Sequence, residues 1–248
     1  MAKKIKNGII AFYDSLFELR PMTKLHGLIF DVDGVIADTE PVNARASIKV
    51  FEDLFGVKGV QRRDFEAGLG RGAAEYVKAA AEIHGLELSE EQIEKATQLR
   101  QQYFLRILSE EPLPAFPGVL ELIEQALHRE DFKVAVATSS TPEKSRAVLE
   151  SAKIPFQKMV YITGNDVKNK KPHPELLLLA AGRMGIEPAN CVVIEDAPNG
   201  VQAARAAGAK CIAVTNSTDA DKLSDADLVC DSLQHINLDM IQELIDLN

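Results

Sequence analysis

The sequence predicts an α/β fold, in which a parallel β-sheet is covered by helices and a second, all-helical domain is inserted into the chain. Short apolar segments alternate with helical segments from about residue 113 to the C-terminus. This alternation is typical of parallel sheets with both faces buried. Residues 40–112 instead contain successive helical patterns with no strand between them, which indicates an insertion. A chain of 248 residues is long enough for both parts.

Six segments have the length and apolar content of buried strands. They are residues 25–31, 132–138, 159–163, 191–196, 210–215 and 227–230. Four further segments have helical periodicity and lie before or between these strands: residues 118–129, 142–152, 174–185 and 198–208. Because most of these helices join two successive strands, we expect the strands to be parallel and the helices to cover both faces of the sheet.

The insertion consists of three helical segments, residues 41–56, 73–85 and 89–111. Gly56 and Gly85 close the first two, and Ser89 with Gln92 has the spacing of a capping box at the start of the third. Three prolines then break the helical pattern. We therefore expect a helical domain and a sheet domain with these bounds: residues 40–112 for the first, and residues 24–39 with 113–248 for the second.

Residues 1–23 are basic at first and then apolar. Asp14 and Glu18 interrupt the apolar part, which is too short to span a bilayer and has no small-residue cleavage pattern. We expect an N-terminal helical extension packed on the core. The role of residues 1–21 stays open, because Met22 could itself be a start codon.

The composition is that of an acidic globular protein, with a formal net charge of -9 and a hydrophobic content of 46%. Binding to nucleic acid or to an anionic membrane needs clustered Lys and Arg, so we expect neither partner. The cysteines Cys191, Cys211 and Cys230 lie far apart in apolar segments and lack metal-site spacing. We interpret them as reduced core residues of a cytoplasmic protein, with an organellar stroma left open as its compartment.

Polar side chains stand directly after three of the predicted strands. They are Asp31 and Asp33, then Thr138 and Ser139, then Glu195 and Asp196. Lys171 stands shortly before the helix of residues 174–185. Because open parallel sheets bind ligands beyond the carboxyl ends of their strands, we expect these side chains to meet in one pocket. Ser140 is interpreted only as a turn or capping residue.

The chemistry of this pocket follows from its charges. Asp31, Asp33 and Asp196 together carry more negative charge than a buried site tolerates, so they must be protonated or neutralised. Clustered carboxylates without nearby His or Cys favour a hard cation that keeps water ligands, which means Mg²⁺. Lys171 and Thr138 can bind phosphoryl oxygens, and a carboxylate next to phosphorus can act as a nucleophile. The sequence therefore predicts a Mg²⁺ cofactor and a small phosphorylated metabolite as partner.

The segment DVDGVIADTE, residues 31–40, resembles the first motif of the haloacid dehalogenase superfamily, D-x-D-G-x-x-x-D-[ST]. Further motifs follow in order: Thr138 in VATSS, Lys171 in KKPHP, and Glu195 with Asp196 in VIEDAPNG. The resemblance extends from about residue 25 to the C-terminus and implies a Rossmann-like core. The helical insertion is similar to the cap of the β-phosphoglucomutase and phosphoglycolate phosphatase type, which usually belongs to monomers.

The resemblance also implies a role for each motif residue. Asp31 would attack phosphorus and form an aspartyl-phosphate, and Asp33 would act as general acid and then as general base. Thr138 and Lys171 would bind the transferring phosphoryl group. The Mg²⁺ ligands would be Asp31, the backbone carbonyl of Asp33, Glu195 and Asp196.

Three further residues are candidates for binding the rest of the substrate: Arg71, Ser139 and Asn43. Arg71 stands in the sequence GLGRG, where related caps carry an arginine that contacts the distal part of the substrate. Asn43 and Ala67 stand where mutases of this type carry a His and a Lys, and both departures favour a phosphatase acting on a sugar-type phosphomonoester. The alternatives are a β-phosphoglucomutase-type phosphohexomutase and a non-catalytic phosphate-binding regulator. Asp33 counts against a dehalogenase, which needs no second aspartate.

Overall fold

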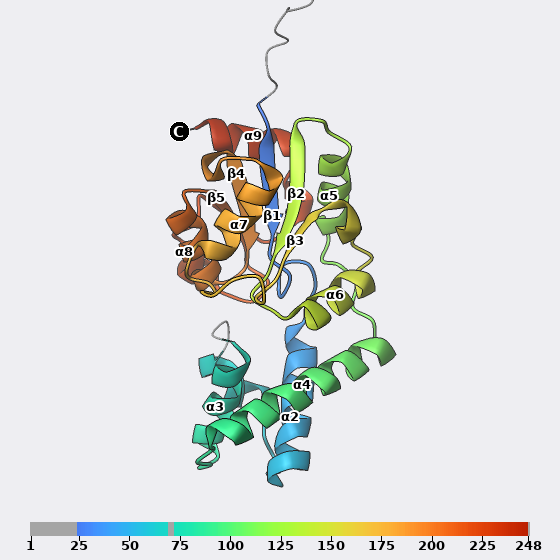
Figure 1. The fold of residues 1–248 in the computed structure, drawn as a ribbon, viewed down its shortest axis with the longest axis vertical. Coiled ribbons are helices and arrows are strands. Elements are labelled where there is room, and N and C mark those ends of the chain that lie inside the picture. Colours follow the sequence, from blue (N-terminus) through green and yellow to red (C-terminus); the bar gives the residue numbers. More distant parts are fainter. Residues whose placement is uncertain (1–23, 69–71, 248) are drawn as a thin grey trace, which may run out of the picture.

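The computed structural model describes residues 24–68 and 72–247. Its centre is a six-stranded sheet with strand order β3-β2-β1-β4-β5-β6, and all neighbouring strands are parallel (Figure 1). The strands are β1 (His26–Phe30), β2 (Phe132–Ala137), β3 (Val160–Ile162), β4 (Cys191–Glu195), β5 (Lys210–Val214) and β6 (Leu228–Cys230). Each lies within its predicted segment, so the predicted α/β fold with a parallel sheet is confirmed.

The sheet is buried on both faces, which explains why its strands are apolar throughout. In β1, Leu28 and Phe30 pack on one face and Ile29 packs on the other, because successive side chains of a strand point in opposite directions. The helices α5 (Val119–Leu127), α6 (Pro142–Ser151) and α9 (Leu238–Asp246) supply the apolar side chains of the first face. The helices α7 (Glu175–Met184) and α8 (Pro198–Ala207) supply those of the second face.

Helix α9 was not among the predicted elements. Its buried side chains Leu238, Ile241 and Ile245 have helical spacing and complete the core beside α5. The side chain of Asn237 caps the helix by accepting a hydrogen bond from the backbone N–H of Met240 at 2.9 Å. Both signals are present in the sequence, in the apolar spacing and in the capping residue.

The second group of helices lies beyond the carboxyl end of the sheet (Figure 1). We call α2 (Glu40–Phe55), the 3₁₀ segment η1 (Arg62–Gly68), α3 (Ala73–Ile83) and α4 (Glu90–Glu110) the helical block. Phe51, Phe65 and Tyr76 belong to an apolar cluster of its own. The predicted capping box is confirmed, because the backbone N–H groups of Ser89 and Gln92 each bond to the side chain of the other.

Helix α4 also contacts the sheet core. Its C-terminal half carries Phe104 and Leu108, which pack in the apolar cluster of the first face of the sheet. The helical block is therefore joined to the sheet by shared packing as well as by the chain itself. The division of the chain at residues 39 and 113 stays a prediction, and the predicted N-terminal extension, residues 1–23, lies outside the described residues.

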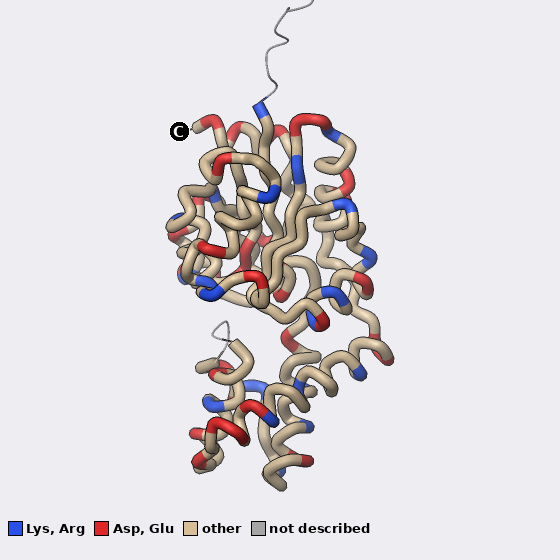
Figure 2. The backbone as a smooth tube through the Cα atoms, in the orientation of Figure 1, with Lys and Arg blue, Asp and Glu red and all other residues tan. Residues whose placement is uncertain are grey.

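Charged residues of both signs are distributed over the sheet domain and the helical block (Figure 2). No helix in residues 24–68 and 72–247 is long and apolar enough to cross a membrane. The three cysteines are free thiols, with Cys191 and Cys211 buried and Cys230 half-buried.

Candidate active site

The strand order places the candidate site at β1. The sheet runs from β1 through β2 to β3 on one side and through β4, β5 and β6 on the other. A crevice forms where the connections diverge to the two sides, beyond the carboxyl ends of such central strands. Asp31, Thr138 and Glu195 stand at the ends of β1, β2 and β4, and the backbone N–H of Asp31 donates to the carbonyl of Ile194 at 3.1 Å.

Lys171 contacts residues at the carboxyl ends of three strands, β1, β2 and β4. Its Nζ donates to Oδ1 of Asp31 at 2.8 Å and to the carbonyl oxygen of Ala137 at 3.1 Å. It also contacts Oε1 of Glu195. Only 4% of the Lys171 side chain is exposed. The loop between β3 and α7 thus brings one ammonium group to residues that follow β1 and β4.

Asp31, Glu195 and Asp196 form a group of three carboxylates, each with an oxygen within 4.8 Å of the others. Burial raises the pKa of all three, and the neighbouring carboxylates raise it further. The charge of Lys171 opposes this rise for Asp31 and Glu195. In turn, the carboxylates of Asp31 and Glu195 raise the pKa of Lys171 despite its burial. Three buried carboxylates face one ammonium, so the group fits a divalent cation that takes oxygen ligands.

Two glycines let the backbone approach these carboxylates. Gly34 has φ of 77°, and a Cβ atom there would lie 1.8 Å from Oδ2 of Asp196. A Cβ atom on Gly200 of α8 would lie 2.0 Å from Cδ of Glu195. A side chain at either position would displace a carboxylate, so the sequence motifs D-x-D-G and N-G around them have a direct steric reason.

Asp33 lies beside a different set of partners. Its Oδ1 accepts hydrogen bonds from Nζ of Lys144 at 2.7 Å and Oγ1 of Thr39 at 2.5 Å, and its Oδ2 accepts one from Oγ of Ser140 at 2.5 Å. Burial by itself would raise the pKa of Asp33. The charge of Lys144 and the three donors outweigh burial and lower the pKa to about 2. In this arrangement Asp33 is an ionised carboxylate.

Several residues of this site were missed by the sequence analysis. Ser140 was interpreted only as a turn residue, whereas its hydroxyl bonds Asp33. Lys144 was not singled out, although it lies in the first turn of α6, the helix that follows β2. After β5, Asn216 donates to the carbonyl of Gly34 at 2.8 Å, and Ser217 bonds Asp196. The available signal was the same for all of them, namely polar residues directly after a strand or in the first turn beyond it.

The remaining predicted residues are distributed as follows. Thr138 is buried, and its Oγ1 accepts the N–H of Ser140 at 3.1 Å. The hydroxyl oxygen of Ser139 is buried without a hydrogen-bond partner among the described residues. Asn43 lies on α2, and its Oδ1 accepts a hydrogen bond from Arg100 at 2.8 Å. Arg71 lies outside the described residues.

Comparison with known relatives places the chain among hydrolases. It is 33% identical over 224 residues to hexitol phosphatase A of Escherichia coli (strain K12), with 86% of this chain and 93% of that protein covered. It is also 33% identical over 221 residues to the protein SUPPRESSOR OF QUENCHING 1, chloroplastic, of Arabidopsis thaliana. In that second match the aligned region covers 88% of this chain but only 21% of the relative.

Solved structures show the same architecture. CbbY from Rhodobacter sphaeroides, in a mutant form in complex with xylulose-(1,5)bisphosphate, is 26% identical, with a TM-score of 0.78 and with 88% of this chain and 99% of that chain covered. β-Phosphoglucomutase from Clostridium difficile is 25% identical, with a TM-score of 0.73 and with 90% and 97% covered. The family model described as haloacid dehalogenase-like hydrolase matches residues 25–208. The chain belongs to the haloacid dehalogenase-like hydrolases.

Proposed function

We propose that this chain is a Mg²⁺-dependent phosphatase that hydrolyses a small, sugar-type phosphomonoester through an aspartyl-phosphate on Asp31. The observation that carries the proposal is the contact between Nζ of Lys171 and Oδ1 of Asp31, at 2.8 Å, within a buried group of acids. The family and the relatives named as phosphatases support the same reaction class.

The proposed reaction has two steps. In the first, a carboxylate oxygen of Asp31 forms a bond to phosphorus, the ester P–O bond breaks, and the leaving oxygen takes a proton from Asp33. In the second, Asp33 removes a proton from water, the water oxygen bonds to phosphorus, and the Asp31–phosphorus bond breaks. Lys171 orients Asp31 and offsets charge on the phosphoryl oxygens, while Thr138 and Ser139 offer hydroxyl donors to them.

The metal ligands of the proposal are Asp31, the backbone carbonyl of Asp33, Glu195 and Asp196. Mg²⁺ bound there would supply positive charge that offsets the carboxylates and stabilises the transferring phosphoryl group. The fit rests on the excess of buried carboxylates over ammonium groups.

Asp33 needs to change its protonation state during this cycle. With Lys144 at 2.7 Å it is in the ionised form that serves as the base of the second step. To act as the acid of the first step, it must lose part of this contact. An anionic substrate that attracts Lys144 would have that effect.

Residues 40–112 act in this proposal as a cap over the crevice. Thr141, the N-cap residue of α6, donates from Oγ1 to Oε1 of Gln101 on α4 at 2.9 Å. Its neighbour Ser140 bonds Asp33, so the helical block and the sheet are joined close to Asp33. We further propose a monomer. Its compartment is proposed to be the cytoplasm or an organellar stroma, since its relatives include bacterial proteins and a chloroplastic one.

The experiment that tests the proposal is hydrolysis of p-nitrophenyl phosphate with Mg²⁺ and with chelator. We expect turnover that depends on Mg²⁺, and an Asp31→Asn variant that loses at least about 10³-fold in kcat, since the nucleophile is removed. Asp38→Asn is the matched control, because Asp38 lies in the same segment and is exposed. Turnover retained by Asp31→Asn, or no turnover by the unchanged chain, would contradict the proposal.

A phosphohexomutase is the second candidate, favoured by the structural similarity to β-phosphoglucomutase. The two functions differ in the acceptor of the phosphoryl group, which is a sugar hydroxyl in the mutase and water in the phosphatase. We expect β-glucose 1-phosphate with a bisphosphate primer to yield inorganic phosphate. Formation of glucose 6-phosphate as the main product would establish the mutase instead.

A further inference from the structure

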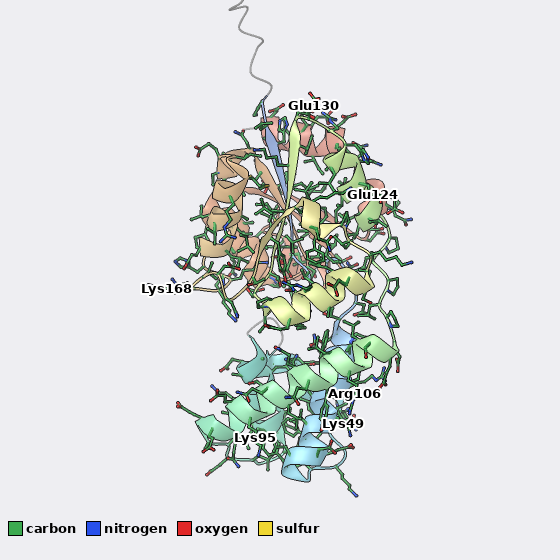
Figure 3. All side chains as sticks on the ribbon, turned by 45° about the vertical axis from the view of Figure 1, so that its right-hand side comes forward. Lys49, Lys95, Arg106, Glu124, Glu130 and Lys168 are labelled. Carbon is green, nitrogen blue, oxygen red and sulfur yellow. The ribbon has the colours of Figure 1, made fainter. Side chains whose placement is uncertain are left out.

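Residues 163–174, which we call the Lys171 loop, connect β3 to α7 and contain no helix or strand. In the middle of this loop Lys168, Asn169 and Lys170 are exposed, and Lys168 lies at the periphery of the sheet domain (Figure 3). Exposed segments of this kind have little buried apolar surface to hold them in one conformation. The ammonium of Lys171 nevertheless has a defined place at the strand ends, so other contacts must fix the loop.

Glu175, the first residue of α7, holds the Lys171 loop through its carboxylate. Its Oε1 accepts a hydrogen bond from the backbone N–H of Lys168 at 2.9 Å. Its Oε2 accepts two from Asn169, one from the backbone N–H at 3.0 Å and one from Nδ2 at 2.9 Å. These donors, the N–H of Lys168 above all, lower the pKa of Glu175, so the acceptor is an ionised carboxylate.

These hydrogen bonds close the chain around Lys171. Lys171 lies between the donors, Lys168 and Asn169, and the acceptor, Glu175. The next residue of α7, Leu176, is fully buried in the apolar cluster of the second face of the sheet. The closed segment is therefore attached to a packed helix, and moving Lys171 away from the strand ends would strain or break its hydrogen bonds.

The contacts of the Lys171 ammonium change during the proposed reaction. Its partner Asp31 loses the negative charge of its carboxylate when it bonds to phosphorus. The attraction between Lys171 and Asp31 then weakens. The hydrogen bonds of Glu175 involve none of the reacting atoms, so they hold the Lys171 loop equally in both steps.

We propose that Glu175 is a positioning residue for phosphoryl transfer, which keeps Nζ of Lys171 beside Asp31 by holding the backbone of the Lys171 loop. The inference rests on the proposed phosphatase function and adds a residue on which that function depends. A displacement of a positioned group by about 1 Å can cost about 10²-fold in rate. Loss of the Glu175 carboxylate should therefore be visible in turnover.

The test measures the hydrolysis of p-nitrophenyl phosphate with Mg²⁺ and its inhibition by orthovanadate, which takes the five-coordinate geometry of a transferring phosphoryl group. Glu175→Ala should lower kcat by about 10- to 100-fold and change KM by less than about threefold. The inhibition constant of orthovanadate should rise by about the factor by which kcat falls. Glu175→Gln, which keeps one acceptor oxygen, should give intermediate values.

Glu121→Ala is the matched control. Glu121 is exposed and is likewise an acid in the first turn of a helix, α5, so its replacement should change kcat by less than about twofold. If Glu175→Ala only unfolds part of the protein, kcat falls with the folded fraction, whereas the inhibition constant of orthovanadate stays the same. That result would assign Glu175 a purely structural role and overturn the inference, as would a kcat of Glu175→Ala equal to that of the control.

Hydrogen exchange separates a failure of this inference from a failure of the proposed function. If the unchanged chain hydrolyses no phosphate ester with Mg²⁺, the proposed function fails. Amide exchange, measured by NMR on the full metal-free chain, still tests how the Lys171 loop is held. The N–H groups of Lys168 and Asn169 should exchange about three- to tenfold faster in Glu175→Ala than in Glu121→Ala. Equal rates would show that Glu175 does not hold the loop and would overturn the inference.

Discussion

The ammonium of Lys144 lies 2.7 Å from Oδ1 of Asp33, and this contact controls the charge of the carboxyl group that we propose as acid and base. Burial would raise the pKa of Asp33, but Lys144, Ser140 and Thr39 together lower it to about 2. With 29% of its side chain exposed, Asp33 is open to water in its ionised form. The contact thus favours the form that accepts a proton.

Replacing Lys144 by Met should therefore change how turnover depends on pH. With p-nitrophenyl phosphate the leaving group needs no proton, so the rate reports mainly on Asp33 as the base. Lys144→Met removes the strongest group that lowers the pKa of Asp33, so we expect this pKa to rise toward its ordinary value of 3.8 and the base to be lost by protonation at a higher pH. With a pKa near 3.8, we expect the rate of the variant, relative to the unchanged chain, to fall by less than about twofold between pH 6 and pH 4 and by about sixfold between pH 6 and pH 3. Lys144→Arg, which keeps the charge, should show a flat ratio; a flat ratio in Lys144→Met would refute the assignment.

Lys171 and Lys170 are adjacent in the chain but lie in different surroundings. Lys171 is buried against two carboxylates, whereas Lys170 is exposed. Lys171→Met leaves Asp31 and Glu195 without their cation, and should lower the free energy of unfolding of the metal-free protein by about 3–5 kcal/mol. Lys170→Met should change it by less than about 0.5 kcal/mol. Urea unfolding in chelator measures both, and equal effects would show that the buried contact contributes little.

Glu195 should make the stability of the metal-free protein depend on pH. Burial and Asp31 raise its pKa from 4.5 to about 7, although Lys171 opposes them. Between these two values the folded protein holds a proton that the unfolded chain has released, so its stability rises as the pH falls through this range. Between pH 8 and pH 6, we expect the free energy of unfolding of the unchanged, metal-free chain to rise by about 1 kcal/mol more than that of Glu195→Gln, as measured by urea unfolding at each pH. Excess Mg²⁺ should remove the gain by keeping the carboxylate ionised, and a gain that persists in Glu195→Gln would point to another group.

Gly200 and Gly182 offer a matched pair of helical glycines. A Cβ atom on Gly200 would meet the carboxyl group of Glu195, whereas a Cβ atom on Gly182 of α7 meets nothing within 4 Å. Gly182→Ala should stabilise the protein by about 0.5–1 kcal/mol. Gly200→Ala should destabilise it by about 1–3 kcal/mol and raise the Mg²⁺ concentration needed for half-maximal turnover. Thermal unfolding and a Mg²⁺ titration measure the two effects; a stabilising Gly200→Ala would show that Glu195 can move freely.

The sequence predicted the sheet because its signals are local. Each strand of a doubly covered parallel sheet is a short apolar segment, as in LIF before Asp31 and VVI before Glu195, and no distant contact is needed to identify it. The rule that parallel strands end at a common edge then brings together Asp31, Glu195 and Asp196, and these three carboxylates form one group in the structure. Helix α9 was missed although its signals were equally local.

What the sequence determined by itself was the class of fold, the acids at the strand ends and the lysine before a helix as candidate site residues. Strand periodicity and ordered motifs can be identified without knowing which segments touch. The surroundings of Asp33 and Arg100 were decided only by the tertiary structure. Lys144 lies 111 positions from Asp33 and Arg100 lies 57 positions from Asn43, and a lysine or arginine in a helix gives no sign in sequence of the group it will contact. Such contacts depend on how α4 packs against α2 and α6, and that packing is set by apolar side chains of the helical block and of the sheet domain together.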